Sequence, residues 1–284
     1  MENNKGKNLS DKEYKKNAEQ KEEQVSNNTN NLNQSNKTRI SFNLVSIICF
    51  IAIIFSLYKI ICWFFENQNN TKILSNIQSQ TQVTQEQISV DGEIVNKFNY
   101  DFTNLLATNK NTVGWIYVPN TNIDYPVVQH TDNDYYLTHS FDNTQNSAGW
   151  IFADYRNNCD NLDYNTVIYG HNRKDKSMFG SLKNVLNSDW YSNEENLYIN
   201  FSTLTENHVY KVFSTFVCND ADVPSYINTS FSSPDEFNSY LQKLKNASSY
   251  NFNTDLENTK HIITLYTCYG LNDQRLLVCA KLIN

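Results

Sequence analysis

The distribution of polar and apolar residues divides the chain into a polar beginning, one long apolar run and a mixed remainder. Residues 1–40 are polar, carry charges of both signs and show no apolar periodicity, so we expect them to be disordered. Residues 41–65 contain about 24 largely apolar residues, which is enough to cross a bilayer. Lys59 lies close enough to the far end of this run to reach the interface, and Trp63 is typical of that interface. The pattern therefore predicts a transmembrane anchor.

A cleaved signal peptide is the alternative interpretation of the same run. Its apolar core would be shorter, about 7–15 residues, and small residues at a cleavage site would follow it. Here the bulky residues Trp63, Phe64 and Phe65 follow instead, which favours an uncleaved anchor.

The basic residues that flank the anchor predict its orientation. Lys37 and Arg39 precede the apolar run, whereas Lys72 is the only basic residue within 66–85. Because positively charged flanks stay on the cytoplasmic side, we expect a cytoplasmic N-terminal tail and a single-pass protein in the cell membrane. Residues 66–85 are rich in Asn, Gln, Ser and Thr and are typical of a stalk, here extracellular. This leaves 86–284 as an extracellular folded domain.

Helical periodicity predicts three helices in the folded domain. Apolar residues recur at helical spacing over 86–108, which predicts a leading helix. A second apolar stripe predicts a helix over 177–187. A third predicts a helix over 234–246, where Ser233 precedes Pro234 at the first helical position.

Short runs of β-branched and apolar residues, separated by turn residues, predict eight strands. These runs are Gly114–Val118, Tyr125–Val128, Gly149–Phe152, Thr166–Tyr169, Leu197–Phe201, Val209–Val217, Ile262–Thr267 and Leu276–Ile283. Eight short strands joined by irregular loops favour a closed β-barrel or a sandwich.

Charge and cysteine content narrow the possible functions. The chain has 284 residues and a net charge of −7, and no cluster of Lys and Arg stands out, so we expect no nucleic-acid partner. The six cysteines form no CxxC pair and no His lies at metal-ligand spacing from them, so neither a zinc site nor any other cofactor is expected. The even number of cysteines permits disulfides, although a chain of this size can build a core without them.

Cys268 is the strongest candidate for chemistry. It ends the strand predicted over Ile262–Thr267, and Arg275 begins the strand predicted over Leu276–Ile283, with turn residues between them. Two strands joined by a short loop pair antiparallel, so the thiol and the guanidinium should face each other across the mouth of a hairpin. A thiol beside a fixed positive charge can serve as a nucleophile with an electrophilic helper.

A thiol nucleophile generally works with a histidine, and the chain contains five. His261 is excluded by geometry, because it lies on the opposite face of the cysteine strand and about 23 Å away at 3.3 Å per residue. His208 begins a strand and is expected at the surface or the edge of the core. His130, His139 and His171 lie in loops, where catalytic groups concentrate. Spacing alone does not rank these three.

Several segments together resemble the sortase family, and class B in particular. Val167–Asn172 and Ser177–Leu182 resemble its histidine segment, and Thr264–Cys268 resembles its TLxTC signature, with Arg275 ahead of the last strand. Three further segments match in order: Gly114–Ile116, Asp124–Val128 and Ile151–Asn157. The resemblance covers roughly 90–284, and the helix at 234–246 together with the leading helix favours class B over class A.

The resemblance implies a mainly β fold with helices: a closed eight-stranded sortase-type β-barrel with an N-terminal helix and a helix between strands 6 and 7. It also implies a membrane-anchored cysteine transpeptidase of Gram-positive bacteria, in which Cys268 is the nucleophile, His171 the general acid and base, and Arg275 the stabiliser of the substrate carbonyl. The sequence departs from the family at Tyr266, where class B enzymes often have Ser, and its Cys-to-Arg loop looks shorter than in some relatives.

The resemblance also implies which residues contact the substrate. Asn133 and the pair Tyr226-Ile227 match positions that line the class B peptide groove, and Tyr266 and Thr267 precede the cysteine. An ordinary turn Asn and a Tyr-Ile pair at the edge of the core are the alternatives for the first three residues.

The implied reaction cleaves a C-terminal sorting motif of secreted proteins and joins them, through a thioacyl-enzyme, to the amine of a peptidoglycan precursor. Three alternatives remain open on the sequence. A membrane-tethered cysteine peptidase would hydrolyse the same intermediate, a pilin-polymerising sortase would use a lysine of another protein as the acceptor, and a non-catalytic adhesin would use the barrel only for binding.

Overall fold

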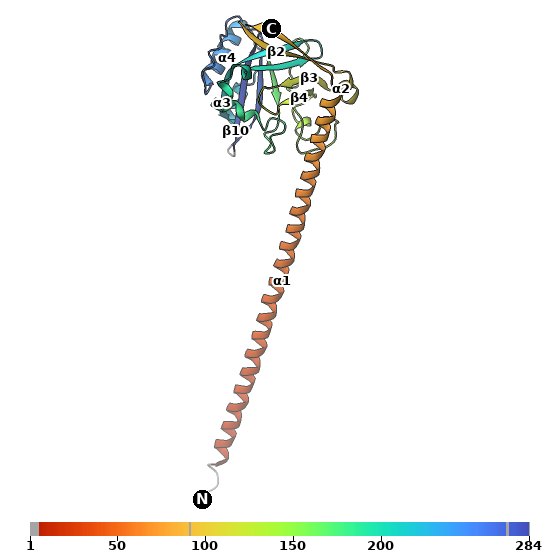
Figure 1. Cartoon of the computed structure of the whole chain (residues 1–284). Coiled ribbons are helices and arrows are strands. Elements are labelled where there is room, and N and C mark those ends of the chain that lie inside the picture. The colour runs from red at the N-terminus through yellow and green to blue at the C-terminus, as the bar shows by residue number, and fades with distance from the viewer. Residues whose placement is uncertain (1–5, 91, 271–272, 284) are drawn as a thin grey trace. The chain divides into compact units, whose positions relative to one another are not determined.

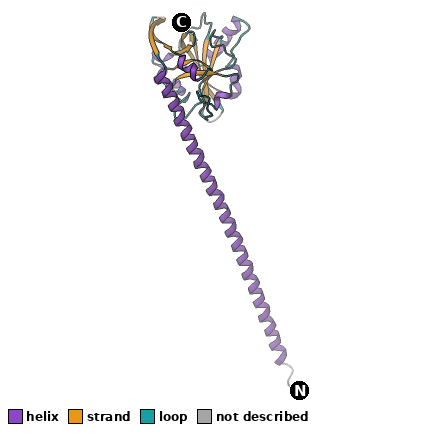
Figure 2. Cartoon of the chain, turned by 90° about the vertical axis from the view of Figure 1, so that its right-hand side faces the viewer, coloured by secondary structure: helices purple, strands orange, loops and turns teal. Residues whose placement is uncertain are grey.

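The computed structural model describes residues 6–90, 92–270 and 273–283. The chain forms two compact units, Met1–Trp63 and Phe64–Asn284, and the described strands all belong to the second (Figure 2). Helix α1 (Gly6–Gln80) forms the described part of the first unit and continues into the second (Figure 1). Its stretch Asn43–Gln80 is long and apolar enough to cross a membrane, with a mean hydropathy of 2.6 in its most apolar window.

The structure differs from the sequence prediction for residues 6–40, which belong to α1 although they lack apolar periodicity. No Gly or Pro occurs from Lys7 to Gln80, so nothing in the sequence interrupts the backbone hydrogen bonds of a helix there. The structure also differs from the stalk predicted over 66–85. The part of α1 that belongs to the second unit is helical and packs on that unit, where Asn70 and Ile77 are buried.

The leading helix predicted over 86–108 is wrong. Strands β1 (Val83–Val90) and β2 (Glu93–Tyr100) form a hairpin there, and only α2 (Thr103–Thr108) is helical. Gly92 has a φ of 88°, a left-handed conformation that suits a tight turn and interrupts any helix. The helical N-terminal element next to the barrel is instead the end of α1, with the short α2 after the hairpin.

Eight strands close into a barrel, which confirms the predicted fold class. The order around the barrel is β10-β8-β7-β3-β4-β5-β6-β9. The strands are β3 (Thr112–Tyr117), β4 (Asp124–Gln129), β5 (Phe152–Ala153), β6 (Asn165–Tyr169), β7 (Tyr198–Thr203), β8 (Asn207–Asn219), β9 (Ile262–Tyr269) and β10 (Gln274–Leu282). Neighbouring strands are antiparallel except for β4–β5 and β6–β9, which are parallel. Apolar side chains from these strands form the main core, with Trp115, Trp150 and Phe201 among the largest that are fully buried.

The helix predicted over 234–246 is confirmed as α4 (Pro234–Ala247), between the sixth and seventh barrel strands. Ser233 caps it by accepting a hydrogen bond from the Glu236 backbone. The helix predicted over 177–187 is largely replaced by irregular structure, because Lys176 and Met178 both have positive φ angles that an α-helix does not allow.

Several short helical elements complete the second unit. The 3-10 turn η2 (Leu182–Leu186) lies within the predicted 177–187 helix, and the single turn α3 (Ser188–Tyr191) follows it. Three further 3-10 turns are η1 (Tyr135–Leu137), η3 (Glu194–Leu197) and η4 (Asp220–Ser225).

Candidate active site

The hairpin of β9 and β10 places the candidate nucleophile opposite the candidate arginine. Cys268 and Arg275 are directly paired in its antiparallel register, as the sequence predicts. The Cys268 side chain is exposed and Arg275 is half-buried. Leu271 and Asn272, in the turn of the predicted shorter loop, lie outside the described residues.

The parallel pairing of β6 with β9 brings His171 to the same place. Tyr169 pairs with Tyr266 at the end of this ladder. Just beyond, the Gly170 backbone N–H donates to the Tyr266 carbonyl over 3.3 Å, and the Thr267 hydroxyl donates to the Gly170 carbonyl over 2.7 Å. His171 and Cys268 are the next residues along these two segments. Parallel strands end at the same edge of a sheet, so His171 and Cys268 both follow or end strands at that edge.

The imidazole of His171 is held by the loop that precedes β5. Its Nε2 lies 2.8 Å from the Leu137 carbonyl, and because a carbonyl only accepts, Nε2 is the donor in this contact. Nδ1 is then the nitrogen that is free to exchange a proton. Gly149 packs against the ring: a Cβ on this residue would lie 3.0 Å from His171 Cδ2 and 2.5 Å from the Tyr136 carbonyl oxygen. Its φ of 59° also favours glycine.

Three acceptors hold the guanidinium of Arg275. Nε donates to the Tyr266 hydroxyl over 2.8 Å, Nη1 donates to the Gln274 carbonyl over 3.0 Å, and Nη2 forms an ion pair with Asp220 at 3.0 Å. An arginine has five N–H groups, so one on each terminal nitrogen remains for a substrate. Burial by itself lowers the pKa of Arg275, but Tyr266, Cys268 and Asp220 together raise it above its ordinary value. The charge is therefore permanent and its direction is fixed.

Tyr266 contributes through its hydroxyl. Burial raises the pKa of Tyr266 although the neighbouring Arg275 charge lowers it in part, so the phenol stays neutral at physiological pH. Its ring makes an edge contact with Tyr169, with ring centroids 5.2 Å apart. Thr267, in contrast, is buried, and its hydroxyl is used in the contact with Gly170, which makes it a residue that aligns the two strands.

Two of the remaining predicted substrate residues, Asn133 and Ile227, converge on a buried carboxylate that sequence reasoning did not single out. Asp154 is fully buried and binds the Arg156 guanidinium through two hydrogen bonds of 2.8 and 2.7 Å. It also accepts a hydrogen bond from the Tyr169 hydroxyl over 2.7 Å and one from the Asn133 amide over 3.1 Å. Arg156 in turn donates to the Ile227 carbonyl over 3.3 Å. The structure thus brings Asn133 and Ile227 together through one polar network.

This network reaches the cysteine strand through Tyr169, whose ring contacts Tyr266. Burial raises the pKa of Asp154, but the hydrogen bonds and charge of Arg156 and the Tyr169 hydroxyl outweigh it and lower that pKa below its ordinary range. The signal for this centre was present in the segment Ile151–Asn157, but only the fold shows that its acidic residue turns inward.

Tyr226 lies beside this network and its side chain has other partners. Its ring contacts Phe216 at 4.9 Å between centroids, and the Lys243 ammonium lies 4.4 Å from the ring centroid. Its carbonyl accepts a hydrogen bond from the Tyr240 hydroxyl over 2.7 Å. Tyr226 is thus anchored to the face of the barrel that α4 covers.

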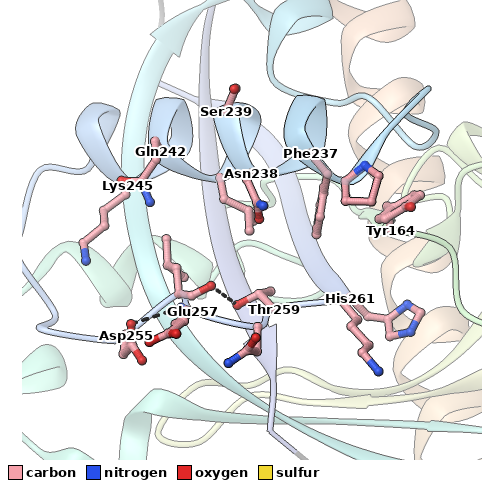
Figure 3. A pocket seen from close by; sticks show the side chains of 15 residues that line it. Tyr164, Phe237, Asn238, Ser239, Gln242, Lys245, Asp255, Glu257, Thr259 and His261 are labelled. Atoms are coloured by element: carbon pink, nitrogen blue, oxygen red, sulfur yellow. Dashed lines mark hydrogen bonds between the residues drawn. The ribbon is translucent and has the colours of Figure 1, made fainter.

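Other candidate chemistry lies apart from this centre. A hollow of about 1040 Å³ between α4 and residues 255–261 is lined by apolar side chains such as Phe237 and by polar and charged ones, including Lys245 and His261 (Figure 3). His261 lies next to the first residue of β9, at the opposite end of that strand from Cys268, and one of its ring nitrogens contacts the Asp163 carbonyl at 3.0 Å. Among the described residues, no group of three or more His, Cys, Asp or Glu lies close enough to hold a metal ion.

Comparison with known proteins identifies the family. A model of the sortase domain matches residues 116–283. The chain is 37% identical over 239 residues to sortase B of Listeria monocytogenes, covering 81% of this chain and 92% of that protein. It is 31% identical over 243 residues to sortase B of Staphylococcus aureus, covering 84% and 96% of the two chains. The crystal structure of Bacillus anthracis sortase B in complex with AAEK1 superposes with a TM-score of 0.64 at 36% identity, covering 78% of this chain and 99% of that one.

The chain therefore belongs to the sortase family. Within it, the protein is a cysteine transpeptidase of the sortase B type, as the sequence resemblance implied.

Proposed function

We propose that this transpeptidase cleaves a C-terminal sorting motif of secreted proteins and transfers the new carboxyl end to an amine of a peptidoglycan precursor. The observation that carries the proposal is the pairing of exposed Cys268 with Arg275 at the edge of the barrel where parallel β6 leads into His171. An exposed thiol next to a fixed positive charge and a histidine has the composition of a nucleophilic acyl-transfer site.

In the first half of the reaction, His171 takes the proton of the Cys268 thiol and the thiolate attacks the carbonyl carbon of the scissile peptide bond. The C–S bond forms while the carbonyl oxygen takes up the negative charge. His171 then gives its proton to the leaving amine as the C–N bond breaks, and a thioester remains on Cys268. In the second half the incoming amine attacks the thioester, loses a proton to His171 and displaces the sulfur, to which His171 returns that proton.

Arg275 stabilises the oxyanion in both halves of this reaction. Its two remaining N–H groups are directed by Tyr266, Gln274 and Asp220, so the donors need little reorganisation when charge develops. Removing such a donor typically costs about 2.7–4 kcal/mol, or roughly 10²- to 10³-fold in kcat.

The peptide groove in this proposal runs past the network of Asn133, Arg156 and Ile227 toward Tyr266. These residues are joined by hydrogen bonds around one buried carboxylate, which gives the groove a rigid polar wall. A preformed wall of this kind lowers the entropic cost of ordering an extended peptide.

The proposal includes a single membrane span with the catalytic domain outside the cell. The exposed apolar stretch of α1 and the basic residues Lys37 and Arg39 ahead of it support this topology. An enzyme held at the outer face would meet both secreted proteins and wall precursors.

The proposal is tested by mass spectrometry of the full chain incubated with a library of sorting-motif peptides. A thioester adduct on Cys268 is expected in the wild type and in Cys279→Ala, a matched control on the same hairpin. Cys268→Ala and His171→Ala should form none, and Arg275→Ala should form it roughly 10²- to 10³-fold more slowly. An adduct in the Cys268→Ala chain would overturn the assignment.

The same experiment separates transfer from hydrolysis. Addition of an amine nucleophile such as triglycine should yield a peptide–amine conjugate. Release of the free acid alone, at every amine concentration, would instead identify a cysteine peptidase.

A further inference from the structure

We propose that the end of α1, residues 64–80, supports the catalytic centre, because Asn70 and Asn67 on this segment position His171. This inference rests on the proposed role of His171 as general acid and base. Residues 64–80 and the barrel belong to the same compact unit (Figure 1). Gln78 near the end of the helix donates to the Asp124 carbonyl on β4 over 2.9 Å.

Asn70 binds the loop that precedes His171 in the chain. Its side chain is 5% exposed, and all its hydrogen-bond partners lie between residues 140 and 149. Its Nδ2 donates to the Gly149 carbonyl over 3.3 Å, while its Oδ1 accepts from the Ser140 hydroxyl and from Asn146 Nδ2, the latter over 3.0 Å. A buried amide with both ends satisfied fixes the position of the helix against this loop.

The same loop contacts the imidazole of His171 at two points. Leu137 supplies the carbonyl that accepts from His171 Nε2, and Gly149 lies against the ring. The Trp150 backbone N–H also donates to the Tyr136 carbonyl over 2.9 Å, which joins the two ends of the loop. A displacement of Gly149 by the loss of Asn70 would therefore move the wall of the imidazole pocket.

Asn67 binds the segment that follows His171. Its Oδ1 accepts a hydrogen bond from Arg173 Nη2 over 2.8 Å. Arg173 also donates to the Ser177 hydroxyl and pairs with Asp175, so it is firmly placed. Residues three apart on a helix share a face, so Asn67 and Asn70 together hold the chain on both sides of His171.

The apolar contacts of the helix allow this role to be separated from folding. Ile73, Leu74 and Ile77 pack against the main core and keep the helix docked when a polar side chain is shortened. The polar contacts then determine where the helix sits along the barrel, and with it where the imidazole points. Small misplacements of a catalytic group are costly, on the order of 100-fold for about 1 Å.

The test uses the full chain in detergent, with the concentration of active sites determined by alkylation of Cys268. Asn70→Ala is compared with Asn69→Ala, the same change at the neighbouring exposed position of α1. We expect Asn70→Ala to lower the kcat for thioester formation per titrated thiol about tenfold, with KM within twofold, and to shift the limb of the pH profile that belongs to the histidine. Asn69→Ala should match the wild type.

Asn67→Ala supplies a second variant if Asn70→Ala folds poorly, and it should lower kcat per titrated thiol about threefold by the same mechanism. The inference would be overturned if both variants had the kcat and pH profile of the wild type. It would also be overturned if alkylation showed that their lower activity comes entirely from fewer active sites. Absence of a thioester in the wild type and in all variants would count against the proposed function instead.

Discussion

The terminal hairpin carries two cysteines whose surroundings differ in almost every respect. Cys268 lies at the open end of the hairpin, exposed and paired with Arg275. Cys279 lies within β10, fully buried and paired with Thr264, whose hydroxyl is 3.8 Å from the sulfur. Both residues belong to the same antiparallel ladder, so their difference comes from position along it.

Burial raises the pKa of Cys279 to about 12, although the Thr264 hydroxyl lowers it in part. A thiol of this kind is a small apolar side chain and does no chemistry at physiological pH. Cys268 differs because the barrel rim leaves it open to a substrate and places a permanent positive charge opposite it. In the proposed function, the reactivity of Cys268 comes from its position at the end of the strand.

The largest expected effect is on the rates of thiol modification. At pH 7.5 a pKa of about 12 leaves roughly 10⁻⁵ to 10⁻⁴ of Cys279 as thiolate, and its sulfur is also shielded from solvent. Iodoacetamide should therefore modify Cys268 at least about 10³-fold faster than Cys279, as followed by peptide mass spectrometry over time. Cys159, whose pKa burial also raises to about 12, should behave like Cys279. Comparable rates for Cys268 and Cys279 in the folded chain would contradict the contrast.

The next effect concerns the charge opposite Cys268. Tyr266→Phe removes the hydroxyl that accepts from Arg275 Nε but keeps the ring against Tyr169. A hydrogen bond to a charged group contributes about 1.5–3 kcal/mol, so we expect kcat to fall roughly 10- to 100-fold with little change in KM. The measurement is steady-state cleavage of a sorting-motif peptide. Tyr250→Phe is the control, since Tyr250 is exposed and stacks on Tyr191.

A different result for Tyr266→Phe would assign its hydroxyl another role. An increase in KM with unchanged kcat would mean that Tyr266 binds the peptide equally in the ground state and the transition state. The sequence resemblance, which places Tyr266 among the substrate contacts, would then be the better guide.

The contrast between the two cysteines also shows how far sequence alone could go. The apolar runs around Cys268 and Arg275 predicted their pairing, because a short loop between two strands allows only an antiparallel hairpin. Spacing could not choose among the three loop histidines. The choice depends on the parallel pairing of β6 with β9, which joins segments about a hundred residues apart and leaves no local pattern.

Two other failures have local causes. The apolar residues of 86–108 fit helical spacing, but Gly92 turns the chain and the residues on either side of it pair as strands. In the sequence, Asn70 looks like one more polar residue of a stalk. Its burial depends on partners in a distant loop, which leave no local signal in the sequence.

The smallest expected effect is on stability at alkaline pH. The pKa of Cys279 is raised from its ordinary value near 9 to about 12, so between these values the unfolded chain loses a proton that the folded chain keeps. This contribution to stability is complete below about pH 9 and is lost as the pH rises toward 12, at about 1.4 kcal/mol per unit. Between pH 8 and pH 10 the free energy of unfolding of Cys279→Ala should therefore fall by about 1.4 kcal/mol less than that of the wild type.

Urea unfolding of the full chain in detergent, under a reducing atmosphere at the two pH values, measures this difference. Val278→Ala is the matched control, because this neighbour of Cys279 on β10 is equally buried but has no titratable group, so the change should leave the wild-type loss unchanged. Equal losses in the wild type and Cys279→Ala would mean that the buried thiol ionises as readily when folded as when unfolded. The difference between the two thiols of the hairpin would then be one of solvent access alone, and the slow modification of Cys279 would have to come from shielding.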